Sequence, residues 1–575
     1  MKFFNSLLFF IITSSAFGVE YPLPSQDAQE SRLTYSARLH DLTIQYAAQK
    51  LAPPPTPPKI GMDPFLMTML SRMVQKTDLD AVSENLLRED FHPWNSGTDI
   101  AIAGSICKRT GDYDFVLMGL IKMAYLDERA GQTLLSPAAR FKLRHELLSE
   151  KGNKHHIRFA LRNCPPIKIK DSENHILMTE ISRYLTNQLL FKENGEAQYD
   201  NEKNGFNKFL LNHLSEFLRK DFDELNSRPY QAFTLIALGN LYSYAENEQV
   251  KTLSQMLLDY LSAKSAIQSK GLRRYTPFRR QLKHRANENL LTGDTAMAWF
   301  GHQTGNAQFF VMDKSIRIND YAYFMGALDD YRIPDFILEL FYETKNPLFQ
   351  KIKARDVEIY FSSPSFTLSA GGRHRKVFGY FTRENDVWAV PTTIIPRSYG
   401  MNMSELFYIQ GPDNFNKRVN LCVAPNFACG VNLHVPKNIP AECKTEHGPW
   451  TFYDLQNCSV KMGFFLATYQ DGENALLEVR EPTLSFQDFQ DRVLKNNPRP
   501  EKTYTTSDNH KIVFDWSRKS TIKSYDGVES THYETWSLAE GNFINSKEDG
   551  LINIQDKLIL DGRNIMEPRR IEKDY

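Results

Sequence analysis

The spacing of apolar residues divides the chain into a helical part and a strand-rich part. From about residue 63 to residue 347, apolar side chains mostly recur at the period of amphipathic helices. The clearest stretches run over residues 115–126, 176–189, 206–218, 230–245 and 250–266. Short connections rich in Pro, Gly, Asn or Asp join them, and such connections make neighbouring helices antiparallel. The pattern predicts about ten helices in a toroid or a solenoid, and the lack of a fixed-period repeat disfavours a TPR-like array.

After the helical stretches, the apolar period changes to two. Candidate strands, rich in β-branched and aromatic residues, lie at 357–361, 377–381, 462–469 and 511–514. A last candidate strand at 551–560 is less regular, because Asn553 and Asp556 interrupt its apolar positions. Many short strands with turn residues between them indicate a β-sandwich. The predicted fold is a multidomain α+β protein, with an N-terminal (α/α) toroid over residues 61–350 and a C-terminal antiparallel β-sandwich over residues 351–575.

The first 18 residues have the organisation of an export signal. A basic residue precedes the apolar run Phe3–Ile12, and Ala16 and Gly18 form a small-x-small cleavage site. The run is too short to span a bilayer of about 30 Å, and no later stretch of 18 apolar residues occurs. No cysteine precedes Cys107, which excludes a lipid-modified N-terminus. We therefore predict a secreted or periplasmic protein with a cleavable signal peptide over residues 1–18 and no transmembrane segment.

A polar arm and a proline-rich spacer follow the signal. Five of the six residues at 53–58 are proline, which excludes a helix and favours an extended linker. We assign residues 19–60 to this arm and linker. At roughly 150 residues per domain, a chain of 575 residues has room for three to four units.

Six cysteines are compatible with an oxidising compartment: Cys107, Cys164, Cys422, Cys429, Cys443 and Cys458. Their clustering suggests that the first two pair with each other and the last four among themselves, with three connectivities open for those four. Their spacing lacks a paired CxxC pattern, which disfavours a zinc knuckle. His155 and His156 have no carboxylate or cysteine at ligand spacing nearby, so we predict no metal site.

The overall charge is balanced, with 69 basic and 69 acidic side chains. This balance argues against a protein that binds nucleic acid or membrane through its whole surface. One segment departs from it, because residues 260–287 contain eight Lys or Arg and no Asp or Glu. The segment is either a solvated charged loop or a surface for a polyanion, where Arg can bind carboxylates or sulfates with two hydrogen bonds. No nucleic-acid-binding motif accompanies it.

Several residues in and after the basic segment are candidates for substrate binding. Arg273, Arg279 and Arg280 would bind acidic groups, and aromatic side chains within the segment could stack on sugar rings. Trp299 and His302 lie just downstream and would line a sugar cleft. A place in the core is the alternative for Trp299.

Two polar segments stand directly before predicted helices. In the first, Asp171 or Ser172 could be the N-cap, and Asn174 and His175 would then point hydrogen-bond donors towards an anion at the positive end of the helix. The second segment places Pro229 at the first helical position, with Tyr230 next to it. The alternative is that these residues only start helices, with Tyr230 as a half-buried aromatic.

The Asn174–His175 pair at one helix start, followed 55 residues after the histidine by Tyr230 at another, resembles the heparinase and oligoalginate lyase group. Those polysaccharide lyases have an α-helical toroid followed by a β-sandwich, an order that matches about residues 60–575. The resemblance implies that Asn174 and His175 neutralise a uronate carboxylate and that Tyr230 transfers the proton. It also implies a His or Tyr from the sandwich, for which His374 is the candidate, although His374 could equally be an exposed loop residue.

β-Elimination requires residues that neutralise a carboxylate and a residue that transfers a proton, and Asn, His and Tyr can fill these roles. The proton next to a carboxylate is weakly acidic until donors neutralise the developing charge, which an Asn amide and a His can do. A Tyr can serve as base only where nearby cations favour its phenolate, and it can then return a proton to the leaving oxygen. No cofactor is required, and a divalent cation is compatible with the reaction but supported by no residue pattern.

We therefore expect an exported polysaccharide lyase that cleaves an acidic, uronate-containing polysaccharide. Its partner would be an anionic polysaccharide or oligosaccharide and not nucleic acid. One alternative is a glycoside hydrolase on an (α/α) toroid, with acids such as Asp221, Asp223 and Glu224, although these also fit a solvated helix end. The other is a non-catalytic glycan-binding envelope protein.

Overall fold

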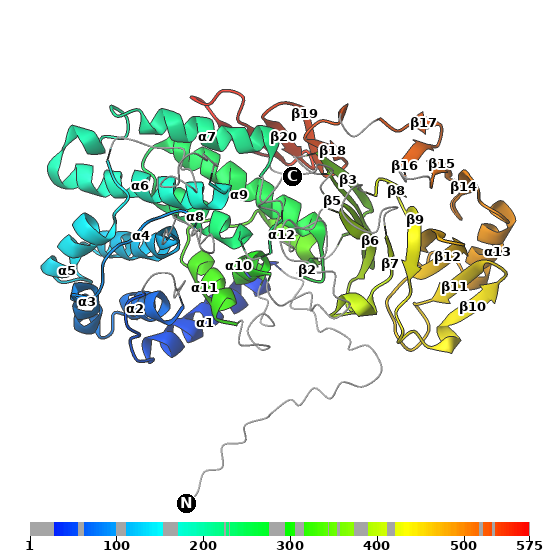
Figure 1. Ribbon diagram of the computed structural model, residues 1–575, viewed down its shortest axis with the longest axis horizontal. Coiled ribbons are helices and arrows are strands. Elements are labelled where there is room, and N and C mark those ends of the chain that lie inside the picture. Colours follow the sequence, from blue (N-terminus) through cyan, green and yellow to red (C-terminus); the bar gives the residue numbers. More distant parts are fainter. Residues whose placement is uncertain are drawn as a thin grey trace, which may run out of the picture.

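The structure is a computed structural model that describes most of the chain from residue 28 to residue 573. The described ranges are 28–55, 63–98, 111–152, 171–222, 226–228, 230–274, 294–304, 316–342, 344–353, 357–372, 389–410, 420–516, 521–531 and 535–573. The predicted signal peptide, the candidate strand at 377–381, Cys107 and Cys164 lie outside these ranges. Over them the protein is an α+β protein, with helices in the N-terminal half and antiparallel sheets in the C-terminal half (Figure 1).

All five helical stretches predicted from the apolar period are helices in the structure. In chain order the α-helices of the N-terminal half are α1 (Ala28–Ala47), α2 (Asp63–Gln75), α3 (Leu79–Leu87), α4 (Tyr113–Arg129), α5 (Pro137–Lys142), α6 (Glu173–Asn194), α7 (Phe206–Lys220), α8 (Gln231–Tyr244), α9 (Glu248–Gln268), α10 (Thr295–Thr304), α11 (Ile316–Ala327) and α12 (Asp335–Tyr342). A π-helical turn at Leu143–Leu147 follows α5 directly. The predicted stretches correspond to α4 and α6 to α9.

The helices differ in how much of their surface is buried. In α7, one face is buried through residues such as Leu210, Leu214 and Leu218, and the rest is polar, as in a helix at the surface. In α6, every residue from Glu173 to Leu190 is buried, and α8 is buried almost throughout. Helices α4, α6, α8 and α10 pack beside one another, so the starts of α6 and α8 lie inside the protein.

Among the described residues, the main sheet has twelve strands. Its members are β3 (Leu348–Lys353), β4 (Val357–Ser362), β5 (Phe366–Gly372), β6 (Ala389–Pro396), β7 (Tyr408–Gln410), β8 (Val423–Ala424), β9 (Phe427–His434), β10 (Lys444–His447), β11 (Trp450–Asp454), β12 (Phe465–Asp471), β13 (Asn474–Arg480) and β18 (Ala539–Gly541). They lie in the order β10-β11-β12-β13-β9-β7-β6-β5-β4-β3-β18, with β8 paired to β9, and each strand pair is antiparallel. A short hairpin, β1 (Ser269–Lys270) with β2 (Arg273–Arg274), follows α9.

Strands from both halves of the main sheet share an apolar core. Leu368 of β5 and Leu466 of β12, far apart in strand order, belong to one buried cluster. The rings of Phe366 and Phe464 meet there with centroids 5.3 Å apart. A second cluster covers the other face of β9, β11, β12 and β13, together with helix α13 (Phe486–Asn496) and three strands of a four-stranded sheet, β14 (Thr503–Thr505), β15 (Lys511–Asp515) and β16 (Thr521–Tyr525). The fourth strand of that sheet is β17 (Val528–Glu529).

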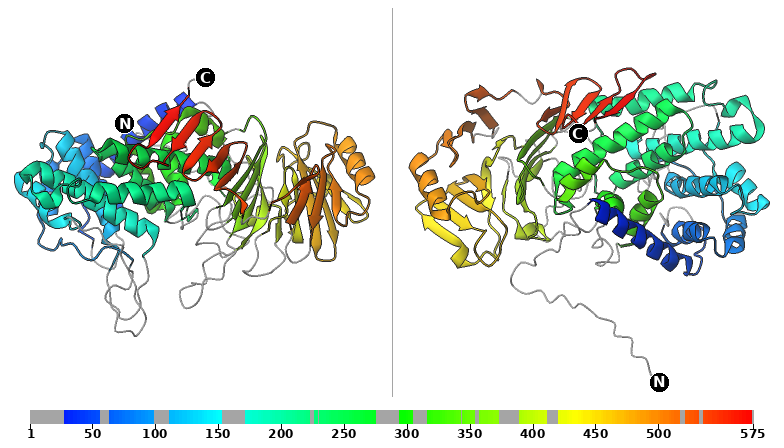
Figure 2. Two further views of the ribbon diagram at one scale, coloured as in Figure 1. Left: turned by 90° about the horizontal axis from the view of Figure 1, so that it is seen from above. Right: turned by 180° about the vertical axis from the view of Figure 1, so that it is seen from behind.

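The last sheet packs on the helices. It consists of β19 (Ile544–Glu548), β20 (Leu551–Ile554), β21 (Leu558–Asp561) and β22 (Arg569–Glu572). Apolar residues of this sheet belong to the same cluster as the helices, and β20 contacts α7 while β22 contacts α9. Figure 2 shows these red strands against the helical part. The candidate strand at 551–560 is therefore two strands, because the chain turns at Gln555 and Asp556, which both have positive φ.

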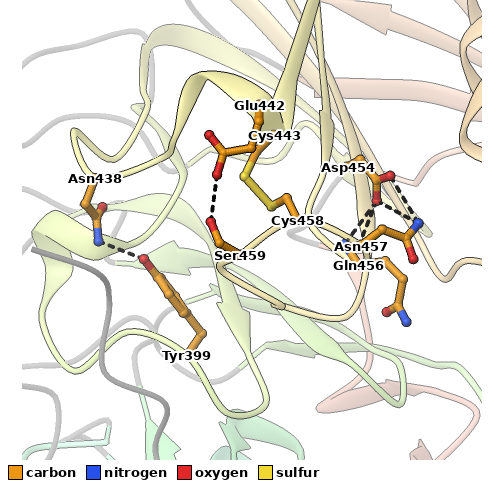
Figure 3. The surroundings of a disulfide bond; sticks show 9 residues. All are labelled: Tyr399, Asn438, Glu442, Cys443, Asp454, Gln456, Asn457, Cys458 and Ser459. Carbon is orange, nitrogen blue, oxygen red and sulfur yellow. Dashed lines mark hydrogen bonds between the residues drawn. A yellow bond between two sulfur atoms is a disulfide. The ribbon is translucent and has the colours of Figure 1, made fainter.

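Two disulfides connect the last four cysteines, one of the three pairings that the sequence leaves open. Cys422 pairs with Cys429 beside the β8–β9 turn, and Cys443 pairs with Cys458. Figure 3 shows the second bond between the start of β10 and the loop after β11, where Ser459 donates to Glu442 (2.8 Å). Within the described ranges, no helix is both long and apolar enough to cross a membrane.

Candidate functional site

The first residues of α6 form a compact hydrogen-bonded group. Ser172 immediately precedes the helix, one of the two N-cap residues that the sequence predicts. Its hydroxyl donates to Oδ1 of Asn174 (2.5 Å) and caps no backbone N–H. Asn174 is 2% exposed, and its Nδ2 has no hydrogen-bond partner among the described residues. The amide of Asn174 is thus a buried donor that remains available.

His175 is held as a cation by neighbouring carboxylates. Its Nδ1 donates to Oδ2 of Asp114 (2.6 Å), and its Nε2 lies 3.9 Å from Oδ1 of Asp112. Burial alone would lower the pKa of His175, but the charge and hydrogen bond of Asp114, aided by two further aspartates, raise it to about 9. The backbone N–H of Gly97 donates to the other oxygen of Asp114 (2.9 Å) and fixes this carboxylate. The imidazole is therefore protonated at neutral pH.

Tyr230 lies at the start of α8, as the sequence predicts. The helix begins at Gln231 and Tyr230 precedes it, while Pro229 lies outside the described residues. The backbone N–H groups of Tyr230 and Gln231 donate to the carbonyl of Ser227 at 3.3 and 3.0 Å. The side chain of Tyr230 is half-buried and packs against the helical core. A short turn therefore fixes the backbone of Tyr230.

The starts of α6 and α8 meet around Phe115 and a small polar cavity. The ring of Phe115 lies 5.1 Å from the ring of His175 and 4.5 Å from the ring of Phe233, between centroids. The cavity is lined by residues of both helices, of α9 and of the turn before α8: Glu173, Asp221, Phe222, Asn226, Gln231, Thr234, Leu261 and Lys264. The segments that carry Asn174, His175 and Tyr230 thus come together at one end of the packed helices α6 and α8.

Asp221 and Lys264 are buried ionic residues in the wall of this cavity. The side chain of Asp221 is 0% exposed, so the expectation of a solvated helix end is wrong for this residue. Nζ of Lys264 contacts Oδ2 of Asp221 and lies 2.6 Å from Oε1 of Glu358 in β4. Burial would lower the pKa of Lys264, but the two carboxylates raise it above its usual value. In the sequence, Lys264 is a charged residue among small and apolar residues of α9, and this pattern could have predicted a buried ion pair.

Three of the predicted substrate-binding residues are buried in the protein. Arg273 donates to the backbone carbonyls of Pro396, Tyr399 and Gly400. Trp299 and His302 lie in α10, where Nδ1 of His302 donates to the carbonyl of Trp299 and burial lowers the pKa of His302 to about 3. All three residues are 0% exposed, so a contact with substrate by any of them stays a prediction.

The remaining predicted residues, Arg279, Arg280 and His374, lie outside the described ranges. One described residue of the basic segment, Arg274, lies beside the start of α8. Nε and Nη2 of Arg274 donate to the two carboxylate oxygens of Asp294 at 3.0 and 2.8 Å. Nη1 of Arg274 also donates to Oε1 of Gln231 (2.6 Å), at the start of α8. Arg274 therefore connects Asp294 to Gln231 at the start of α8.

The arrangement can bind an anion and can move a proton. Asn174 supplies an N–H donor that has no partner among the described residues, His175 supplies a positive charge, and α6 the positive end of its dipole. Tyr230 supplies a hydroxyl on the adjoining helix. In the part of the chain that the structure describes, no group of three or more His, Cys, Asp or Glu side chains could hold a metal ion.

Asn174 and His175 lie in the first turn of α6, and Tyr230 directly precedes α8. These residues lie at the starts of two packed helices, which is the arrangement described above. Neither a protein-family model, nor a curated protein, nor a solved structure matches the chain.

Proposed function

We propose that the protein is a polysaccharide lyase that cleaves an acidic, uronate-containing polysaccharide by β-elimination. The observation that carries the proposal is the convergence of two helix starts, one with the free amide of Asn174 and the cation of His175, the other with Tyr230. Anions bind favourably at helix N-termini that also offer such donors. The carboxylate of a uronate sugar is the anion that this chemistry would use.

Each residue has one role in the proposed reaction. Asn174 and His175 bind the uronate carboxylate and stabilise the charge that develops when the neighbouring C–H proton leaves. Tyr230 takes that proton, the bond to the leaving oxygen breaks, and a carbon–carbon double bond forms. The leaving oxygen then receives a proton from Tyr230, which conserves protons over the cycle.

The proposal extends to the finer architecture and to the location of the protein. We infer an (α/α) toroid for the helical part, and the packing of alternate helices α4, α6, α8 and α10 supports it. We infer a β-sandwich for the strand-rich part, supported by the core that strands from both halves of the main sheet share. His374, Arg279 and Arg280 remain the proposed contributions of the sandwich and the basic segment. Two disulfides are compatible with export by the proposed signal peptide.

The Tyr230→Phe variant tests the proposal. The wild-type protein should raise ultraviolet absorbance when incubated with alginate, heparin or hyaluronate, because elimination leaves an unsaturated sugar. Tyr230→Phe removes the hydroxyl and should lower this rate by about 10² to 10⁴-fold. The matched control is Tyr242→Phe, which removes another partly buried hydroxyl from α8 and should keep full activity. Activity of Tyr230→Phe equal to that of the control would contradict the role of Tyr230.

A hydrolase is the second candidate, because Glu173 and Asp221 both line the cavity beside the site. Most glycosidases use a pair of carboxylates as their catalytic residues. Hydrolysis would release reducing ends without a rise in ultraviolet absorbance, and Glu173→Gln would then be the inactive variant. A protein that binds glycans without either product would support the non-catalytic alternative.

A further inference from the structure

A buried polar cluster joins the helical part to the main sheet next to the proposed site. Its centre is Glu358 of β4, which is 0% exposed. Oε1 of Glu358 lies 2.6 Å from Nζ of Lys264, which also contacts Asp221. Oε2 accepts from the hydroxyl of Tyr360, the neighbouring residue on the same face of β4. A carboxylate from the sheet therefore reaches the wall of the cavity in the helical part.

The same carboxylate fixes Asn226 from one side. Nδ2 of Asn226 donates to Oε2 of Glu358 (2.9 Å), and Nε2 of Gln268 donates to that oxygen as well (2.8 Å). Nε2 of Gln268 also lies 2.9 Å from Oδ1 of Asn226, so both ends of this amide are held. The amide orientation of Asn226 follows from these contacts, since its donor side faces a carboxylate.

Asn226 begins the turn that carries Tyr230. Its φ is 45°, in the left-handed region that residues other than glycine adopt uncommonly and that Asn tolerates better than most. Ser227 follows, and its carbonyl accepts from the backbone N–H groups of Tyr230 and Gln231. An amide that is bonded at both ends supplies the interactions that hold such a conformation.

We propose that Glu358 is a positioning residue of the site: it holds the turn 226–230 and thereby places Tyr230 for proton transfer. The inference rests on the proposed function, to which it adds a residue from the strand-rich part. Glutamine at this position would keep the shape, but its amide can present only one acceptor oxygen. Lys264, Asn226 and Gln268 all direct N–H donors at the carboxylate. The NH2 group of a glutamine would therefore face at least one of these donors and could not accept its hydrogen bond.

The test compares Glu358→Gln with Glu478→Gln in the full chain. Glu478 of β13 is a matched control, because it is 1% exposed and accepts from Tyr504 (2.6 Å) and Ser507 within the strand-rich part. Both variants should lower the melting temperature. Only Glu358→Gln should lower kcat, by about 10²-fold, with little change in KM, since a misplaced proton-transfer group affects the chemical step. Equal kcat values for the two variants would overturn the inference.

Hydrogen–deuterium exchange of the unliganded proteins separates this inference from the proposed function. In Glu358→Gln the backbone amides of residues 230–233 should exchange faster than in the wild type, and in Glu478→Gln they should not. If the wild type shows no elimination on any polysaccharide, the proposed function fails while the exchange result still decides the role of Glu358. Unchanged exchange at residues 230–233 in Glu358→Gln would refute that role even if the wild type is an active lyase.

Discussion

The charge of His175 couples the proposed site to the stability of the fold. Asp114 and its neighbours raise the pKa of this buried histidine to about 9, against about 6.5 in an unfolded chain. A group whose pKa is higher in the folded state binds its proton more tightly there. Its stabilising effect is complete below pH 6.5 and is lost as the pH rises through 9. The shift corresponds to about 3 kcal/mol in the free energy of unfolding.

Chemical denaturation at pH values from 6 to 9.5 measures this effect. The wild type should lose stability across this interval, and His175→Gln should be less stable at pH 6 with a flatter pH dependence. His145→Gln is the control, because His145 also lies beside a carboxylate, 2.9 Å from Glu193, but is partly exposed. A pH dependence that is the same in His175→Gln and in the wild type would contradict the assigned charge state.

At the residue scale, the sequence predicts those features that depend on residues close by in the sequence, such as helix starts. The polar residues before α6 and α8 are recognisable as helix starts, and they are found there. The surroundings of Arg273 are not predictable in this way, because its partners are backbone carbonyls more than a hundred residues away and no side-chain type marks them. The contact between Asp114 and His175 is not predicted either, because the two residues lie in different helices and meet only when α4 packs against α6.

At the scale of elements, the close packing of α8 depends on one glycine. A Cβ added at Gly239 would lie 2.1 Å from Oδ2 of Asp329, which is ion-paired to Lys122 with both side chains 0% exposed. Alanine is favoured over glycine in a helix by about 1 kcal/mol. Displacing a buried carboxylate from its partner costs more, about 3 to 5 kcal/mol. Gly239→Ala should therefore destabilise the protein by about 2 to 4 kcal/mol.

The comparison with Gly119→Ala makes this prediction specific. A Cβ at Gly119 of α4 would meet the end of the Leu66 side chain, with Cδ1 at 2.7 Å. Leu66 can change rotamer, whereas Asp329 is held by Lys122, so Gly119→Ala should cost less. Denaturation midpoints of the two variants measure the difference. A larger loss in Gly119→Ala than in Gly239→Ala would mean that helix α8 or Asp329 can move away.

The elements predicted from periodicity are mostly correct because the period reports a local property. Even α6 and α8, buried on nearly all sides, keep apolar residues at helical spacing. The candidate strand at 551–560 is the exception. Asn553 and Asp556, which interrupt its pattern, bond to each other and close the turn between β20 and β21, with Nδ2 to Oδ1 at 2.6 Å. The interruption marks a hairpin and not an irregular strand.

At the scale of the whole molecule, the last sheet is held to the helices partly by an ion pair. Nε of Arg570 in β22 donates to Oδ2 of Asp259 in α9 (2.6 Å), and the side chain of Asp259 is 0% exposed. The hydroxyl of Tyr331 donates to the other oxygen (2.9 Å). Arg570→Ala leaves a buried carboxylate without its cation, so it should lower the free energy of unfolding by about 3 to 5 kcal/mol.

Arg563→Ala is the matched control for Arg570→Ala. Arg563 pairs with Asp561 at 2.7 Å, but its side chain is 45% exposed, and exposed pairs contribute little. Urea denaturation followed by the helical circular dichroism signal should show a large shift for Arg570→Ala and no measurable one for Arg563→Ala. Equal, small shifts would mean that the sheet is not fastened to α9 through this pair.

The placement of the last sheet could not be read from the sequence. Alternation of apolar residues predicts strands at its position but does not say which core they join. In the sequence these residues follow the other strands, which favours the wrong core. Phe543, Ile552 and Leu560 in fact pack with helices that end some two hundred residues earlier. Complementary apolar surfaces decide such contacts, and these exist only after both parts are formed.

This packing has a consequence for how the protein is made. A ribosome that has finished the helices has not yet produced Phe543, Ile552 and Leu560, which complete their core. Until the end of the chain has been synthesised, part of the apolar surface of the helices therefore stays exposed to solvent. Such exposed surface favours aggregation. A transcript cut short near its 3′ end would yield a chain that contains every residue of the proposed site and still cannot close the core beneath it.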